Sequence, residues 1–177
     1  MAVVPPVAAL DAVEELAAQL HGELPHSARR TPRAHWHLTL QFLGDRADLD
    51  GVAAALSNLA VRSGDVALGG VGAFPTARRA RVIFLGVAAG AEWLAQVSAA
   101  VGVVLAPLGH EPERRDYTPH LTLARAKAPL DARTMIDRAA AGRVGEAFTV
   151  SELVLFESVL GPTGAQHRVH ASFPLGA

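Results

Sequence analysis

A four-residue motif, His-Leu-Thr-Leu, occurs twice in this chain, at residues 37–40 and 120–123. Successive residues of a β-strand point to opposite faces, so the histidine and threonine of each copy share one face. The two leucines share the other face, where they would pack into a core. Two copies of this motif are far more than chance placement predicts in a chain with 8 histidines. We therefore expect each His–Thr pair to face a common surface.

Two imidazoles and two hydroxyls in one cleft suit acid–base chemistry at phosphorus. Imidazole titrates near pH 6.5, about neutrality, so one ring can accept a proton while the other donates one. The base deprotonates a water, and the acid protonates the departing sugar oxygen. Hydroxyls and nearby arginines can hold the phosphate anion between the rings. The motifs thus predict in-line displacement on a phosphodiester, with four site residues: His37, Thr39, His120 and Thr122.

A zinc hydrolase is the alternative for the same region. His35 and His37 are two residues apart, and His120 would complete a set of three imidazoles of the kind that some zinc hydrolases use. This alternative leaves both threonines without a role and does not explain the repeated motif. The chain has no cysteine, which excludes thiolate metal sites, disulfides and a cysteine nucleophile.

Composition narrows the class of protein further. The chain has 177 residues, 50% of them hydrophobic and 19% charged, which fits one folded domain and excludes a disordered chain. A formal net charge of −1 argues against a protein that coats duplex nucleic acid by charge alone. No charge-free apolar run reaches about 18 residues, and the first residues lack a basic leader. We expect a cytoplasmic monomer without membrane contact.

Hydrophobic periodicity predicts alternating helices and strands, and hence an α+β or α/β class. Polar loops at 21–33 and 110–118 each precede a motif strand. This recurrence predicts a single domain, residues 1–177, built of two diverged halves at about 1–88 and 89–177, each contributing one motif strand. Helices are expected at 9–20, 49–61, 91–105 and 131–141, and strands at 35–43, 66–71, 82–87, 119–124, 148–156 and 167–173.

The paired motifs resemble the two His-x-Thr-x motifs of the two-histidine (2H) phosphoesterases. Within that group the chain looks like the bacterial RNA 2′,3′-cyclic phosphodiesterases, also called 2′-5′ RNA ligases of the LigT type. The resemblance rests on WHLTLQFLG at 36–44, GGVGAFPTARRARVIFLGV at 69–87, APLGHEPERRDYTPHLTLAR at 106–125, LVLFES at 153–158 and LGPTGAQHRVHASFPL at 160–175.

This resemblance implies a bilobal α+β fold, with two pseudo-symmetric lobes whose antiparallel sheets surround a central cleft. It implies hydrolysis of RNA 2′,3′-cyclic phosphate ends to 2′-phosphomonoesters, with no metal or other cofactor. His37 matches the proton donor, His120 the proton acceptor, and Thr39 and Thr122 the hydroxyls that hold the phosphate. Substrates would be RNA ends or small cyclic-phosphate nucleotides. Reversible 2′-5′ RNA ligation and a non-catalytic RNA-end binding protein remain open.

The family also begins with a hydrophobic strand, of which this sequence holds only the end, so a short first strand is expected.

Other residues are candidates for substrate binding. The HLTLAR stretch assigns Arg125 to the substrate, although in a regular strand it would point away from the site unless the chain bends after Leu123. Arg79 lies in an Arg-rich turn and could reach an RNA backbone. Trp36 and Tyr117 flank the two motifs and could line the cleft. Core packing is favoured over base stacking for Phe42 and Phe74, and no role is assigned to His167 or His170.

Overall fold

The computed structural model describes residues 1–176 apart from 45–46, 112–115, 140–141 and 162–163. Its named strands join into one antiparallel sheet in the order β7-β4-β5-β6-β3-β1-β8-β9, with β2 paired to β6. The strands are β1 (Ala2–Val3), β2 (Ala28–Arg30), β3 (Leu38–Thr39), β4 (Gly64–Phe74), β5 (Ala80–Ala89), β6 (Leu121–Leu130), β7 (Arg143–Val150), β8 (Glu152–Gly161) and β9 (Gly164–Pro174). The helices are α1 (Val7–Glu23), α2 (Leu49–Leu56), α3 (Ala91–Leu105) and α4 (Arg133–Arg138).

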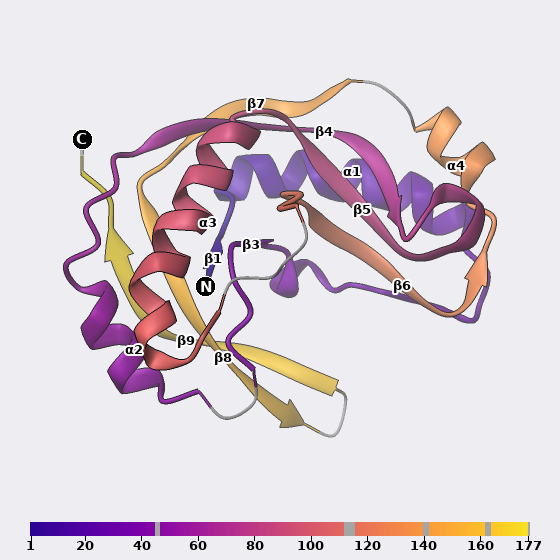
Figure 1. The fold of residues 1–177 in the computed structure, drawn as a ribbon. Coiled ribbons are helices and arrows are strands. Elements are labelled where there is room, and N and C mark those ends of the chain that lie inside the picture. Colours follow the sequence, from indigo (N-terminus) through magenta and orange to yellow (C-terminus); the bar gives the residue numbers. More distant parts are fainter. Residues whose placement is uncertain (45–46, 112–115, 140–141, 162–163, 177) are drawn as a thin grey trace.

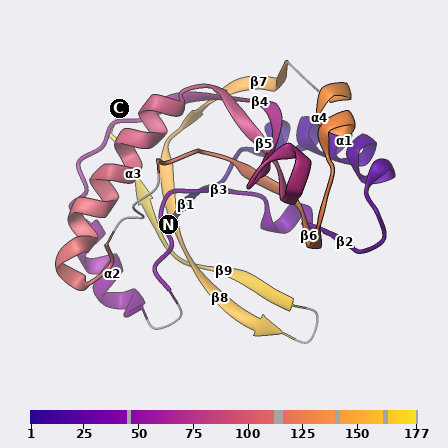
Figure 2. The ribbon, with the colours of Figure 1, turned by 45° about the vertical axis from the view of Figure 1, so that its right-hand side comes forward.

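The sheet divides into two lobes. Strands β7, β4, β5, β6 and β2 form the first lobe, and strands β3, β1, β8 and β9 form the second lobe. Helix α1 packs on β7, whereas α2 packs on α3 and β9. Figures 1 and 2 show the helices α2 and α3 at one end of the molecule, α1 and α4 at the other, and the β8–β9 hairpin projecting from the body. The predicted bilobal α+β fold with antiparallel sheets is confirmed.

Each lobe takes strands from both parts of the sequence. Strands β4 and β5 precede residue 90, yet they pair with β7 and β6, which follow residue 120. In the second lobe, β1 and β3 likewise pair with one another and β1 with β8. The boundary between the lobes in space therefore does not follow the division of the sequence near residue 88.

Several elements differ from the expected ranges for reasons of pairing. The predicted loop at 21–33 contains β2, which pairs with β6. The strand expected at 148–156 is two strands, because the chain crosses at Ser151 from the first lobe to the second. The strand expected at 35–43 is reduced to the two paired residues of β3, since a 3-10 turn at Arg33–His35 precedes it. Helix α2 ends at Leu56, earlier than residue 61.

The first strand is short, as expected, and central. Strand β1 lies between β3 and β8, with Ala2 paired to both Thr39 and Val154. Ala2 and Val3 are buried. Two residues are enough to complete the sheet here because neighbouring strands cover both edges of β1.

One stretch, Ala91–Leu108, has the length and mean hydropathy of a membrane span. Its apolar residues at helical spacing are fully buried in this fold: Leu94, Val97, Val101 and Leu105. A core helix passes the same length and hydropathy test, so this stretch is weak evidence for a membrane span. In this fold one side of the helix is buried, and the helix packs on α2.

The two motif strands meet at one residue pair. Leu38 of β3 is paired with Leu121 of β6, and this pairing is where β3 and β6 join the two lobes. Both leucines are 0% exposed and belong to a continuous hydrophobic core. The core therefore runs through the junction between the lobes and anchors both motifs.

Truncation at this junction should destabilise the whole molecule. Leu38→Ala is expected to lower the free energy of unfolding by about 3 kcal/mol, because it removes a buried side chain and leaves a cavity. Leu108→Ala is the matched control, since Leu108 is 46% exposed. Urea unfolding followed by circular dichroism measures both variants. Similar losses in the two would contradict the junction's place in the core.

Candidate active site

The Leu38–Leu121 pair determines how the two motifs face one another. Residues directly opposite in an antiparallel pair point to the same face, so both leucines point into the core. Their neighbours along the strands point to the other face. The same register sets His37 across from Thr122, and Thr39 across from His120. The two motifs are thus related by a local twofold axis, and they line one cleft of about 580 Å³ with His37, Thr39, His120 and Thr122 all in its wall.

The His120 ring is fixed by one hydrogen bond and two aromatic neighbours. Its Nδ1 lies 2.8 Å from the carbonyl oxygen of Thr118 and donates its proton to that oxygen, so in the neutral form of the ring Nε2 carries the lone pair. Phe74 and Phe84 stack with ring centroids 4.4 Å apart, and their centroids lie 5.0 and 5.2 Å from that of His120. The ring therefore presents Nε2 as its reactive nitrogen.

His37 has a less solvated setting. Its ring lies against Phe156, with centroids 5.5 Å apart, and against His167, at 5.2 Å. Burial disfavours the charged ring and lowers the pKa of His37 to about 4; the neighbouring His167 adds to this, while a hydrogen bond with the His35 backbone opposes it. In the unliganded protein His37 is therefore neutral at pH 7. The backbone two residues earlier bonds the ring in both motifs.

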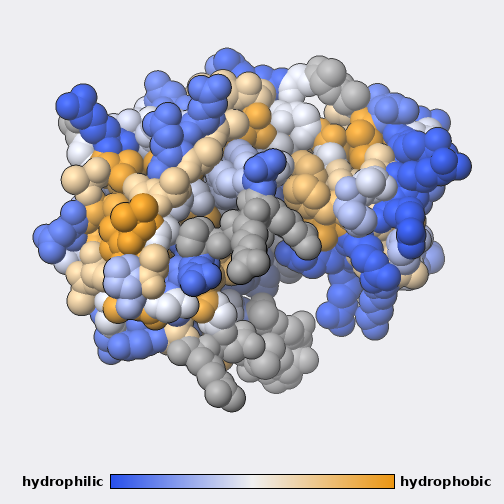
Figure 3. All heavy atoms as spheres, in the orientation of Figure 1, coloured by the Kyte–Doolittle hydropathy of each residue, from blue (hydrophilic) through white to orange (hydrophobic). Residues whose placement is uncertain are grey.

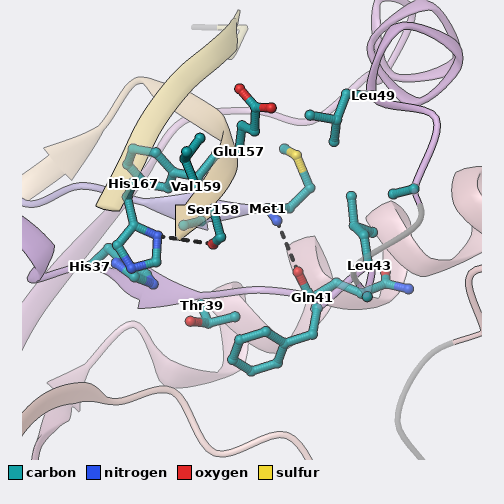
Figure 4. A pocket seen from close by; sticks show the side chains of 15 residues that line it. Met1, His37, Thr39, Gln41, Leu43, Leu49, Glu157, Ser158, Val159 and His167 are labelled. Carbon is teal, nitrogen blue, oxygen red and sulfur yellow. Dashed lines mark hydrogen bonds between the residues drawn. The ribbon is translucent and has the colours of Figure 1, made fainter. Parts of the chain in front are cut away.

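His167 is the residue of this site that sequence reasoning missed. It comes from β9, its Nδ1 lies 3.4 Å from Oγ of Ser158, and it lines the cleft beside His37 (Figure 4). Burial lowers the pKa of His167, and the nearby His35 lowers it further. The spacing of His167 and His170 suggested opposite faces and no role. No local signal could have found His167, because only the pairing of β8 with β9 brings it to His37.

Arg125 reaches the cleft through a β-bulge. The register between β5 and β6 shifts between Ile83–Ala124 and Phe84–Thr122, so β6 has an extra residue at this point. Leu123 and Ala124 are both buried, which breaks the usual alternation. Arg125 thereby shares a face with Thr122 and lines the cleft. The bend after Leu123 that Arg125 needs in order to face the cleft is therefore present, as a β-bulge.

The other predicted binding residues lie elsewhere. Trp36 is 4% exposed, and its Nε1 donates to the carbonyl oxygen of Thr31. The expectation that Trp36 lines the cleft is therefore corrected: its ring is a core side chain. The hydroxyl of Tyr117 donates to the carbonyl oxygen of Thr39, which braces β3. Arg79 is exposed in a 3-10 turn outside the described cleft lining.

Phe42 and Phe74 also differ from the preference for core packing. Phe42 is 65% exposed and lines the cleft, so the expectation of core packing is wrong for this residue. Phe74 packs edge-on against His120. An adjoining cleft of about 830 Å³ shares part of this wall. The shared residues are His37, Thr39, Phe42 and His167, and the wall continues through Phe156 and Ser158.

The zinc alternative fails on ligand geometry. Among the described residues, no three His, Asp or Glu side chains are grouped closely enough to share a metal ion. His35 lies against His167, with ring centroids 4.9 Å apart, and His120 lies elsewhere in the cleft, against the stacked pair of Phe74 and Phe84. His35, His37 and His120 therefore do not form the predicted set of three ligands.

Two His–Thr pairs on a bilobal antiparallel fold define a two-histidine phosphoesterase. The family model of the 2′-5′ RNA ligase superfamily matches residues 4–161. The chain belongs to this superfamily.

Curated relatives share this family. The chain is 30% identical over 148 residues to an RNA 2′,3′-cyclic phosphodiesterase of Aquifex aeolicus, a match that covers 79% of this chain and 78% of that protein. It is 30% identical over 115 residues to the enzyme of the same name from Aeropyrum pernix, where 62% of this chain matches 65% of the relative. The predicted family is confirmed, and the predicted enzyme class is the one that these relatives carry in their names.

Solved structures confirm the fold over nearly the whole chain. A protein of Thermus thermophilus superposes with a TM-score of 0.75 at 26% identity and covers 98% of this chain, which spans 94% of that structure. LigT of E. coli in its apo form superposes with a TM-score of 0.77 at 19% identity, covering 99% of this chain and 95% of LigT.

The lowered pKa of His37 predicts a loss of stability in acid. The folded protein favours the neutral ring of His37, and this preference stabilises the folded state. The stabilisation is complete above pH 6.5, about the pKa of a histidine in the unfolded chain, and it is lost as the pH falls toward 4. A shift of this size is worth about 3 kcal/mol. His37→Asn should therefore show a smaller drop in unfolding free energy between pH 7 and pH 4.5 than the wild type, measured by urea unfolding. His26→Asn, in an exposed loop, should keep the wild-type drop. Equal drops in all three proteins would refute the assignment to His37.

Proposed function

We propose that this chain hydrolyses the 2′,3′-cyclic phosphate at RNA ends to a 2′-phosphomonoester, and that His37 and His120 are its acid–base pair without a metal ion. The observation that carries the proposal is the twofold arrangement of the two His–Thr pairs across one cleft. The names of the curated relatives support the reaction class. The pairing of imidazoles with hydroxyls supports the mechanism, because these groups supply both proton transfers and donors to the phosphate.

The chemistry needs one bond made and one broken. One imidazole takes a proton from water as its oxygen attacks phosphorus, and the bond from phosphorus to O3′ breaks. The opposite imidazole gives its proton to O3′, leaving a 3′-hydroxyl and a 2′-phosphate. Hydroxyls of Thr39 and Thr122 donate to the non-bridging oxygens of the reacting phosphate.

His37 fits the predicted role of proton donor only when the anion is bound. The ring is neutral in the free protein, and a phosphate between the two motifs favours its charged form. Substrate binding and proton uptake by His37 are then coupled. His120 keeps Nε2 free to accept the proton of the attacking water.

Ligation is a second candidate, favoured by the name of the superfamily. If the 5′-hydroxyl of a second RNA replaces water as the nucleophile, the same displacement yields a 2′-5′ linkage. The acid–base pair has the same two tasks. A 5′-hydroxyl RNA added to the assay below would give a longer product if this reaction occurs.

A short RNA ending in 2′,3′-cyclic phosphate tests the proposed reaction directly. In the presence of EDTA, the wild-type protein should give a product that is one water heavier and sensitive to phosphatase, read by mass spectrometry. Turnover that EDTA abolishes and Zn²⁺ restores would refute the metal-free mechanism. Tight RNA binding without product would instead indicate a non-catalytic RNA-end binding protein.

Replacement of either histidine should nearly abolish turnover. His37→Ala and His120→Ala are each expected to lower kcat by about 10²–10⁴-fold, because general acid–base catalysis is worth that much. Thr39→Val and Thr122→Val should lower kcat/KM by about 10- to 100-fold, the worth of a hydrogen bond to a charged group. His26→Ala and Thr134→Val are exposed controls and should match the wild type. Near-normal kcat in either histidine variant would sink the two-histidine mechanism.

A further inference from the structure

Two arginines lie side by side at the rim of the cleft. Strand β2 pairs with β6, and its register sets Arg29 directly opposite Arg125. Residues opposite in an antiparallel pair share a face, so both guanidinium groups project on the side of the sheet that carries Thr122. Arg29 and Arg125 both line the cleft with His120. The added strand β2 therefore adds positive charge beside the second motif.

This pair costs stability in the free protein, because like charges directly opposite on neighbouring strands repel. Neither Arg29 nor Arg125 makes an ion pair with a carboxylate of the described residues. Other arginines of the same lobe do have carboxylate partners: Arg33 with Asp11 and Glu14, Arg133 with Asp131, and Arg143 with Glu146. Two unneutralised guanidinium groups at one register position are suited to an anion supplied from outside.

The two adjoining clefts differ in chemistry. The wall of the cleft of about 830 Å³ includes the aromatic rings of Phe42 and Phe156. It also carries the polar groups of Gln41 and Ser158 and the carboxylate of Glu157 (Figure 4). The cleft of about 580 Å³ carries three arginines, Arg29, Arg30 and Arg125. In Figure 3, hydrophilic side chains gather over the end of the molecule where β5 and β6 lie, and the surface is hollowed between this end and the β8–β9 hairpin. A nucleobase suits the first cleft and a phosphate the second.

We propose that Arg29, together with Arg125, binds the phosphodiester that joins the terminal nucleotide to the rest of the RNA. This inference rests on the proposed function and extends it to substrate length. A 2′,3′-cyclic phosphate terminus has two parts that leave the reaction centre, the base and the 5′-phosphate. The base lies toward Phe42, and the 5′-phosphate lies on the paired guanidinium groups. RNA ends are then preferred over cyclic mononucleotides, which lack this phosphate.

The test compares two substrates with the full chain. One is a pentanucleotide RNA ending in 2′,3′-cyclic phosphate, and the other is the matching 2′,3′-cyclic mononucleotide with a 5′-hydroxyl. The wild type should show a higher kcat/KM for the RNA, and Arg29→Ala should lower the ratio of the two values by about tenfold, the worth of one charge-assisted contact. The dependence of log KM for the RNA on log salt concentration should become shallower by about 1.

Matched variants separate this contact from a structural effect. Arg168→Ala removes an exposed arginine of β9, whose cross-strand partner is Glu157, and should keep the wild-type ratio. Arg29→Lys should restore part of the ratio, because a point charge remains. Arg29→Ala should unfold at or above the wild-type midpoint, since like-charge repulsion is relieved.

The outcomes of the two proposals are distinct. Equal kcat/KM values for both substrates in the wild type, or an unchanged ratio in Arg29→Ala, would overturn the inference and leave the hydrolysis intact. Equal losses on both substrates in Arg29→Ala would also overturn it, because Arg29 would then act on the reacting phosphate. Absence of turnover on either substrate in the wild type would refute the proposed function itself.

Discussion

The active cleft depends on one pairing, between Leu38 and Leu121, where the two lobes join. Both side chains are sealed in the core, and an antiparallel pair has its own twofold axis. That axis brings each histidine beside the threonine of the other motif. The reactive geometry is therefore as stable as the core beneath it, although β3 has only two residues.

The surroundings break the symmetry that this pairing creates. His37 is covered by Phe156 and His167, which makes its charged form unfavourable. His120 is flanked by Phe74 and Phe84, with its Nδ1 bonded to a carbonyl oxygen. Two rings with the same local sequence thus lie in different surroundings. The proposed acid–base mechanism requires two groups with different tasks, because one must accept a proton while the other donates one.

The strands that flank the motifs give the two ends of the cleft different side chains. On the side of β8 and β9 its wall includes Phe156 together with the carboxylate of Glu157, and on the side of β6 and β2 it carries arginines without carboxylate partners among the described residues. A ligand with a flat base, a reactive phosphate and a second phosphate carries groups that match those along the cleft wall, in the same order. In the proposed binding mode, the parts of an RNA end match this distribution of groups along the cleft, and the two histidines lie where those parts meet.

The sequence by itself was enough to predict the two His–Thr pairs. That prediction needs only the two-residue period of a strand and the burial of leucine. It also predicted helix α3, whose apolar stripe is local. Tertiary structure decided the rest. Arg125 faces the cleft because β6 bulges against β5, and His167 reaches His37 because β9 pairs with β8. Arg29 meets Arg125 only through the β2–β6 register. Register and bulges depend on partners far away in the chain, and no local pattern specifies them.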